Sequence, residues 1–329
     1  MRERKTDDSV WDFDGGASRP PARGLGQRLG AILVCAALAP SALAGSVHYV
    51  YAQSPGPTHD GRTWCSAVLD LQTALDRAFF GDEIRVAQGV YRPSSAGLSD
   101  ARDATFALSA GVTLRGGYAG CGALLPDLRH PANFRTVLSG DLAGDDAATG
   151  NTGDNAYHVV TAINLDVDTV LDGFEIRAGH ADGDGFPAGR GVGGGVYSIG
   201  NLTVRDCTFV DNFAQVGGGF YSLEGSPVIE RCRLLDNRAE RGAGMTLYGF
   251  NFFASLPDGS GGSASLRHGT PRVVDALFEA NEATGSAGAL WVNGIAENPT
   301  LTHCIFRNNL AGDDAGAVFC GGGFTILEN

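Results

Sequence analysis

The sequence has almost no lysine and an excess of acidic side chains. Lys5 is the only lysine among 329 residues, and 24 basic residues face 37 acidic ones, which gives a formal net charge of −13. A chain of this charge repels a polyanion, so nucleic acid is excluded as a partner. Charged residues make up only 19% of the chain and hydrophobic residues 43%, which excludes an intrinsically disordered protein.

The sequence also lacks an apolar run long enough to cross a membrane. The apolar stretch at residues 31–39 is well short of the ~20 residues that a span requires. Three arginines precede it, and the small-x-small pattern Ala42-Leu43-Ala44 follows it directly before Gly45. This pattern is typical of a secretory signal peptide rather than a membrane anchor. We therefore expect residues 1–44 to be removed and the chain to be secreted or held in the cell envelope, with no transmembrane segment after cleavage.

No CxxC pair and no cluster of cysteine and histidine is present, which excludes the usual structural zinc sites. Six cysteines remain after the signal peptide, and an oxidising compartment permits disulfides. Cys65 and Cys121 are the better candidates for a bridge. Cys207, Cys232 and Cys304 occupy equivalent points of a repeat, where a small buried residue explains them.

What the sequence does have is glycine, with 49 residues or about twice the ordinary usage, and an internal repeat. One template occurs at residues 204–212 (VRDCTFVDN), 229–237 (IERCRLLDN), 273–281 (VVDALFEAN) and 301–309 (LTHCIFRNN). A second, glycine-rich or alanine-rich piece alternates with it, at residues 193–197, 217–221, 242–246, 287–291 and 315–319. A period of 24 to 25 residues between the first copies indicates a solenoid.

The local pattern of the repeat favours strands over helices. Apolar and polar residues alternate within pieces of three to six residues, separated by Gly, Asn and Asp turns. Glycine or alanine at the start of the second piece suits a tight bend with positive φ or close backbone approach. The asparagines that end the four templates tolerate a left-handed backbone and can hydrogen-bond along a ladder when stacked. We therefore predict an all-β fold, a right-handed parallel β-helix of roughly half a dozen coils.

The repeat resembles a known family. Residues 209–212, 278–281 and 306–309, alternating with the GGGV or AGAV pieces, are similar to the FxxN and GGA[ILV] repeats of bacterial polymorphic outer membrane proteins. A wider resemblance, over residues 48–329, links the chain to secreted bacterial right-handed β-helix repeat proteins of the pectin-lyase-like superfamily. It rests further on the stretches 64–75, 81–91 and 154–160. Because that superfamily includes lyases, hydrolases and adhesins, the resemblance implies a fold but no single activity.

The N-terminal region of the expected solenoid has a helical pattern. Apolar residues within 67–80 lie on one stripe of a helix, and Gly81-Asp82 ends it; the stripe contains Val68, Leu71, Leu75, Ala78 and Phe79. Such a helix would cap the open end of the coils, as the resemblance also implies. We assign residues 1–44 to the signal peptide, 45–92 to the cap helix and first strand, and 93–329 to the coils. Residues 324–329 begin another strand and stop, so we expect the sequence to be a piece of a longer protein.

Two acidic segments raise the question of calcium. Asp182 and Asp184 could offer oxygens to Ca²⁺, but the third acidic position and the distal Glu of an EF-type loop are missing, which favours a turn. The acidic region of residues 141–154 has the same ambiguity; it contains Asp141, Asp145, Asp146 and Asp154. No other cofactor is indicated.

An insertion of about twenty residues, 250–269, interrupts the regular coils. It carries Phe250, Phe252, Phe253, Arg267 and His268, none of which the repeat template requires. Exposed aromatic side chains there could stack on sugar rings or meet a partner, whereas the simpler alternative is that they fold back onto the outer sheet.

No set of catalytic residues is evident in the sequence. A uronate lyase of this fold needs several carboxylates on adjacent coils beside an Arg or Lys base, and residues 129–135, with two arginines, are interpreted as a loop. A polygalacturonase-type site would need an Asn-Thr-Asp motif, which is absent. We therefore expect an exported scaffold at the cell surface for adhesion or polysaccharide binding; the alternative is a polysaccharide lyase or glycoside hydrolase.

Overall fold

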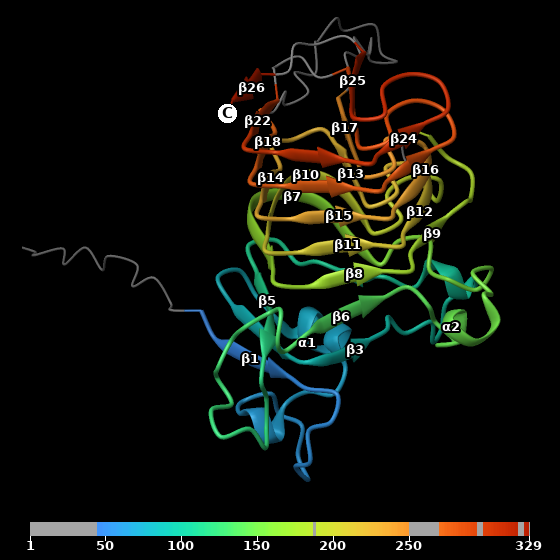
Figure 1. The fold of residues 1–329 in the computed structure, drawn as a ribbon. Coiled ribbons are helices and arrows are strands. Elements are labelled where there is room, and N and C mark those ends of the chain that lie inside the picture. Colours follow the sequence, from blue (N-terminus) through green and yellow to red (C-terminus); the bar gives the residue numbers. More distant parts are fainter. Residues whose placement is uncertain (1–44, 187–188, 250–269, 295–298, 322–325, 329) are drawn as a thin grey trace, which may run out of the picture. The chain divides into compact units, whose positions relative to one another are not determined.

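The computed structural model describes residues 45–329 apart from 187–188, 250–269, 295–298, 322–325 and 329. The chain divides into two units, residues 1–43 and 44–329, and only the second contains described residues. The predicted signal peptide lies outside the described residues. The second unit is mostly β, with short helices and three sheets whose strands pair in parallel (Figure 1).

The largest sheet, sheet A, has 14 strands. Its long strands, β7 and β10, pair with one set of neighbours through their first half and with another set through their second half, so the sheet has two arms. The strands are β1 (Val47–Val50), β2 (Glu83–Ala87), β4 (Phe106–Ala107), β5 (Thr113–Tyr118), β7 (Val160–Asp172), β10 (Val196–Arg205), β13 (Phe220–Leu223), β14 (Val228–Glu230), β17 (Met245–Tyr248), β18 (Arg272–Val274), β21 (Leu290–Asn293), β22 (Thr300–Thr302), β25 (Val318–Gly321) and β26 (Ile326–Glu328).

Two smaller sheets complete the fold. Sheet B has seven strands, β3 (Gly89–Tyr91), β6 (Thr136–Ser139), β8 (Glu175–Arg177), β11 (Thr208–Val210), β15 (Arg233–Leu235), β19 (Leu277–Glu279) and β23 (Ile305–Arg307). Sheet C has five strands, β9 (His180–Ala181), β12 (Phe213–Val216), β16 (Arg238–Arg241), β20 (Glu282–Ala283) and β24 (Leu310–Ala311).

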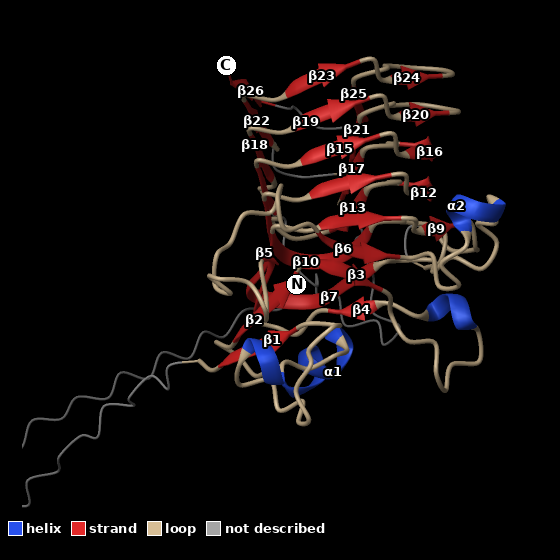
Figure 2. Ribbon diagram, turned by 60° about the horizontal axis from the view of Figure 1, so that its bottom comes forward, coloured by secondary structure: helices blue, strands red, loops and turns tan. Residues whose placement is uncertain are grey.

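From β10 onward the chain visits the three sheets in a fixed order. One strand in sheet B is followed by one in sheet C and then by one in each arm of sheet A, so each strand pairs with the equivalent strand of the next copy (Figure 2). In sheet B the register places Phe209 beside Leu234, then Phe278, then Phe306. The longer step between Leu234 and Phe278 contains the insertion 250–269. The predicted parallel, all-β arrangement of the repeat agrees with these sheets.

The apolar core lies between the sheets. In strands β8, β11, β15 and β19 of sheet B the middle side chain points inward, and these residues, Ile176, Phe209, Leu234 and Phe278, are fully buried. The rings of Phe278 and Phe306 stack with centroids 4.9 Å apart. The cysteines that precede two of these strands, Cys207 and Cys232, are buried and free, as the repeat predicted; Cys304 is half-buried.

The repeated asparagines form a continuous ladder. Asn212 donates from Nδ2 to Asn237 Oδ1 at 3.0 Å, and Asn237 donates in the same way to Asn281 at 3.0 Å. Asn281 in turn donates to Asn309 at 2.8 Å. The predicted ladder is confirmed. The predicted left-handed backbone is displaced by one residue, because the positive φ angles fall on the residues before these asparagines, Asp211, Asp236, Ala280 and Asn308.

The glycine-rich pieces turn the chain from sheet C into sheet A. Their first residue has a positive φ in every copy, +64° at Gly193 and +72° at Gly217, and Ala287 adopts the same conformation at +63°. At the next position a Cβ on Gly194 would lie 2.2 Å from the main-chain oxygen of Phe213. Both expected uses of glycine, positive φ and close backbone approach, are therefore present.

The predicted N-terminal helix is shorter than expected. Helix α1 comprises Leu71–Arg77; it begins after Asp70, whose carboxylate accepts from the Thr73 main-chain nitrogen at 2.7 Å. Leu71 and Leu75 are buried against the core as predicted, but Phe79 is 79% exposed. The prediction that Phe79 belongs to the buried stripe is wrong, because the helix ends at Arg77 and the chain leaves the helical path. The other short helices are two 3₁₀ turns, Trp64–Ser66 and Ala101–Asp103, and α2 (Asp146–Thr149).

Cys65 and Cys121, the pair that the sequence favoured, are joined by a disulfide in the structure. The bridge ties the segment before α1 to the segment after β5, next to the aromatic cluster of Trp64 and Tyr118. In the part of the chain that is described, no helix has the length and apolarity needed to cross a bilayer.

Candidate functional site

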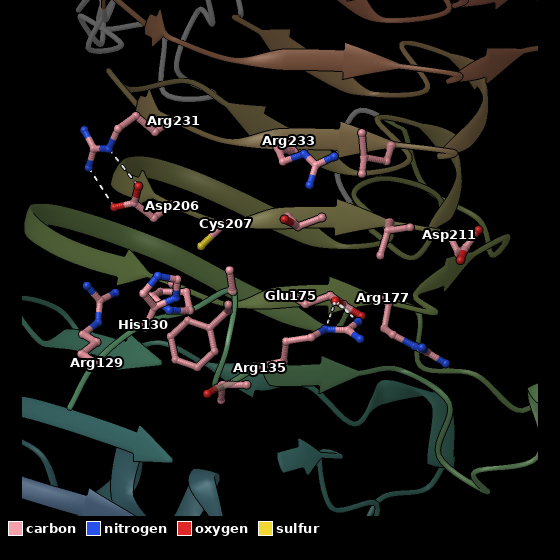
Figure 3. A pocket seen from close by; sticks show the side chains of 18 residues that line it. Arg129, His130, Arg135, Glu175, Arg177, Asp206, Cys207, Asp211, Arg231 and Arg233 are labelled. Atoms are coloured by element: carbon pink, nitrogen blue, oxygen red, sulfur yellow. Dashed lines mark hydrogen bonds and ion pairs between the residues drawn. The ribbon is translucent and has the colours of Figure 1, made fainter. Parts of the chain in front are cut away.

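A groove of about 840 Å³ lies along the outer face of sheet B (Figure 3). Its floor comes from strands β8, β11 and β15, and the segment before β6 forms one border. The lining residues with charged or titratable side chains are Arg129, His130, Arg135, Glu175, Arg177, Asp206, Cys207, Asp211, Arg231 and Arg233.

The alternation of side chains along each strand explains why charged groups gather here. Because Ile176, Phe209 and Leu234 point into the core, the residues on either side of them point outward. The parallel register places Glu175, Thr208 and Arg233 in one row across the sheet. A second row consists of Arg177, Val210 and Leu235.

The groove is richer in positive charge than the chain as a whole. Five arginines and one histidine line it, against three carboxylates, whereas the whole chain has a net charge of −13. Such a local excess attracts anions in spite of the overall charge, since a concave surface concentrates the field of its own side chains.

Three of the five arginines have carboxylate partners. Arg231 forms a two-point ion pair with Asp206, with N···O distances of 2.8 and 2.9 Å, and this raises the pKa of the guanidinium. Arg135 is paired with Glu175. Arg129 pairs with Asp172 at 2.5 Å and donates to the main-chain oxygen of Gly116 at 2.8 Å. These pairs fix the borders of the groove.

Arg177 and Arg233 differ from the other three, because neither forms an ion pair with any described residue. Arg233 is exposed and Arg177 is half-buried. Asp211 lies at the same end of the groove as Arg177 (Figure 3). Partial burial and the neighbouring charge of Asp236 raise the pKa of Asp211, while the charge of Arg177 acts to lower it. The two unpaired guanidinium groups are thus available to an anionic ligand.

Asp182 and Asp184, the possible calcium ligands of the 179–190 loop, are not brought into a cluster. Asp182 pairs with Arg102 at 2.6 Å and lies 3.7 Å from His180. Although partial burial acts to raise its pKa, the hydrogen bond and charge of Arg102 lower it. Asp184 is exposed and is not part of any group of three metal-ligating side chains among the described residues. Asp182 therefore anchors the loop to Arg102 in this structure.

The candidates in the insertion cannot be placed. Phe250, Phe252, Phe253, Arg267 and His268 all lie outside the described residues. Their predicted part in recognition stays a prediction.

The structure does gather one group of carboxylates. Oxygens of Asp141, Asp145 and Asp146, from the loop after β6, lie within 4.8 Å of one another, which is the only such group of metal-ligating side chains in the described ranges. None of the three lines the groove. A lyase needs its carboxylates and its base on one face, and the groove's Glu175 and Asp206 are already held by arginines.

Sequence reasoning missed the groove. Residues 129–135 were interpreted as a loop, which they are, but their position beside β8 and β11 depends on the path of the chain between β5 and β6. The outward residues of the repeat carry a signal that could have been used. Arginine occupies an outward position at Arg233 within the second copy of the template, and also at Arg177, on a strand that pairs with the first copy.

In comparisons with known proteins, no family model, no curated protein and no solved structure matches this chain.

Proposed function

We propose that this protein is an exported right-handed parallel β-helix that binds an acidic polysaccharide in the groove on sheet B. The observation that carries the proposal is that two arginines of the groove, Arg177 and Arg233, form no ion pair with any described residue, on an otherwise acidic chain. The resemblance to polymorphic outer membrane protein repeats and to the pectin-lyase-like superfamily is part of the same proposal.

The order in which the chain visits the sheets supports the β-helix. Each strand of sheet B pairs in parallel with the equivalent strand of the next copy, after a passage through sheets C and A. Crossover connections between parallel strands are right-handed in nearly all known cases, which favours the right-handed form.

The chemistry of the groove favours carboxylate or sulfate groups. A guanidinium presents parallel N–H donors that match the two oxygens of a carboxylate, and such charge-assisted bonds are stronger than neutral ones. Arg177 on β8 and Arg233 on β15 are separated by strand β11, so a linear polyanion lying across the strands would meet both.

Two features support an extracellular location. The N-terminal 44 residues have the pattern of a secretory signal. The disulfide between Cys65 and Cys121 is of a kind that persists in oxidising compartments. Surface adhesion through a polysaccharide is the role that fits these features.

The alternative, a polysaccharide lyase or glycoside hydrolase, has less support. The carboxylates that line the groove are engaged by arginines or separated from one another, and the group of three carboxylates lies elsewhere. Binding without bond cleavage is therefore the function that we infer.

The test is a binding titration of the full chain with polygalacturonate, with dextran as the neutral comparison. The double variant Arg177→Gln, Arg233→Gln removes both unpaired charges, and Arg272→Gln removes one exposed arginine outside the groove. We expect binding of polygalacturonate alone and a loss of at least about 10-fold in the double variant, because a hydrogen bond to a charged group contributes about 1.5–3 kcal/mol. Arg272→Gln should change the affinity little.

Two results would contradict the proposal. Equal binding of dextran would show that recognition does not depend on the charge of the polysaccharide. Full affinity in the double variant would show that Arg177 and Arg233 do not contact it. Release of unsaturated uronate by the wild-type chain would establish the enzyme instead.

A further inference from the structure

A second set of polar side chains lies in the loop between β6 and β7, apart from the groove. The carboxylates of Asp141, Asp145 and Asp146 approach within 4.8 Å of one another; Asp141 is buried and the other two are half-buried. Three negative charges at this distance repel one another unless a cation or protons offset them.

The described part of the chain supplies little positive charge to this cluster. Arg92 approaches it, but its Nε donates to the main-chain oxygen of Asp141 at 2.6 Å rather than to a carboxylate. The charges that act on Asp146 come from Asp141, Asp154 and Asp145. The strongest charges acting on Asp146 are therefore all negative.

Asn155 provides an independent observation. Its side chain is only 1% exposed, and its Nδ2 donates to Asp146 Oδ2 at 2.9 Å, so the amide lies directly against the cluster. Its Oδ1 is buried and has no hydrogen-bond partner among the described residues. A buried polar atom without a partner is rare and costly, so this oxygen needs an explanation.

Two carboxylate oxygens of the cluster also have no hydrogen-bond partner among the described residues. They are Asp145 Oδ1 and Asp146 Oδ1, and both are buried. All three unsatisfied atoms are acceptors, and they belong to adjacent side chains. A bound cation takes several oxygen ligands at once and offsets the repulsion between the carboxylates, whereas one protein donor would satisfy a single oxygen.

The donor set indicates which cation. It consists of oxygen atoms alone, from three carboxylates and one amide, and hard cations prefer such ligands. Ca²⁺ accepts six to eight oxygens in flexible geometry, whereas Mg²⁺ demands near-ideal octahedral geometry. A site with one amide and three carboxylates from a single irregular loop fits Ca²⁺ better.

We propose that Asp141, Asp145, Asp146 and Asn155 bind Ca²⁺ and so hold the loop of residues 141–155. The ends of this loop are already joined, since the Ala156 main-chain nitrogen donates to the Gly140 oxygen at 2.8 Å. Gly140 in turn donates to the main-chain oxygen of Arg177 at 2.9 Å, which links the site to strand β8. The site does not depend on the function proposed for the groove.

Thermal unfolding of the full chain, stripped of metal with EDTA and dialysed, tests the site. We expect the midpoint to rise by about 5 °C when Ca²⁺ reaches about 100 times its Kd, since a ligand that binds only the folded state stabilises it. Ca²⁺ should be titrated to at least about 1 mM, because the Kd of extracellular calcium-binding modules reaches about 1 mM. At equal concentration Mg²⁺ should raise the midpoint less.

Matched variants locate the effect. Asp146→Asn should abolish the calcium-dependent rise and should not lower the midpoint without calcium, because it removes like-charge repulsion. Asp145→Asn serves as a second variant should the first fail to fold. Asp184→Asn, at an exposed aspartate of the 179–190 loop, should keep the full rise.

The proposal would be overturned by a wild-type midpoint that does not respond to Ca²⁺, which would mean that water completes these hydrogen bonds. A response that persists unchanged in Asp146→Asn and Asp145→Asn, or that is lost in Asp184→Asn, would place the site elsewhere. A larger response to Mg²⁺ than to Ca²⁺ would overturn the assignment to calcium.

Discussion

Buried amide side chains occur both in the coils and in the 141–155 loop, and the two regions complete the hydrogen bonds of these amides differently. In the coils, Asn237 is fully buried; its Nδ2 donates to the Phe209 oxygen and to Asn281, and its Oδ1 accepts from Asn212. In the loop, Asn155 is equally buried but its Oδ1 has no partner among the described residues.

The difference follows from repetition. Each copy of the repeat places an identical amide one strand away, so that the inner asparagines, Asn237 and Asn281, both accept from and donate to another asparagine. A loop that occurs once has no second copy to complete its hydrogen bonds. Its unsatisfied oxygens are the basis of the calcium proposal, whereas the satisfied asparagines of the ladder stabilise the coils.

The largest effect on stability is expected where the core is given a charge without a partner. Cys232 is 1% exposed, and burial already raises the pKa of its thiol to about 12. Cys232→Asp should lower the free energy of unfolding by about 3–5 kcal/mol, because it buries a carboxylate while the neighbouring Arg231 is already paired with Asp206. The measurement is urea unfolding, with Cys232→Ala as the control, for which we expect a loss of about 1 kcal/mol. Equal midpoints for the two variants would show that this position is not part of the core.

The ladder itself should come next. Asn237→Ala removes the hydrogen bonds that Asn237 Oδ1 accepts from the main chain and side chain of Asn212, and those that its Nδ2 donates to Phe209 and Asn281. We expect a loss of about 3 kcal/mol in urea unfolding. Asn309→Ala, at a half-buried position further along the ladder, should cost about 1 kcal/mol. If Asn309→Ala lowered the free energy of unfolding as much as Asn237→Ala, the number of hydrogen bonds in the ladder would not explain the effect.

A smaller effect is expected from the half-buried His158. Burial lowers its pKa to about 4, although its hydrogen bond with the Gly193 oxygen acts in the opposite direction. Between pH 6.5 and pH 4 the unfolded chain takes up a proton that the folded chain does not, so this residue reduces stability as the pH falls. At pH 5 we expect the loss to be about 1–2 kcal/mol relative to pH 7.

His158→Gln should remove that part of the pH dependence. The control is His59→Gln, at an exposed position, which should leave the difference between pH 7 and pH 5 unchanged. Thermal unfolding at the two pH values measures both. An unchanged pH dependence in His158→Gln would show that the imidazole titrates freely in the folded protein.

The smallest effect on stability should come from deleting residues 250–269. Shortening the connection between β17 and β18 changes the closure entropy by only about 1 kcal/mol, and both strands keep their partners in sheet A. If the groove carries recognition, polygalacturonate binding should survive the deletion. Loss of binding would instead support the prediction that Phe250, Phe252, Phe253, Arg267 and His268 contact the ligand.

The sequence predicted the repeated parts of the fold well and the unique parts poorly. The strands, the glycine bends and the asparagine ladder follow from a template that recurs, so several copies support each inference. The end of α1 and the exposure of Phe79 were missed, because a single copy gives no such check.

The candidate sites show the same limit. The amino-acid pattern identified the acidic residues around Asp141, but the contact between Asn155 and Asp146 depends on the path of the intervening loop. The groove brings residues 129–135 beside strands that are 40 to 100 residues further along the chain. No local pattern encodes such a contact, since it is set by the stacking of one coil on the next.

A crystal structure of the full chain with a short oligogalacturonate tests the central claim most directly. The account predicts electron density for the sugar across strands β8, β11 and β15, with carboxylates hydrogen-bonded to Arg177 and Arg233. Density for the sugar on another surface, with these two arginines left without a ligand contact, would contradict it.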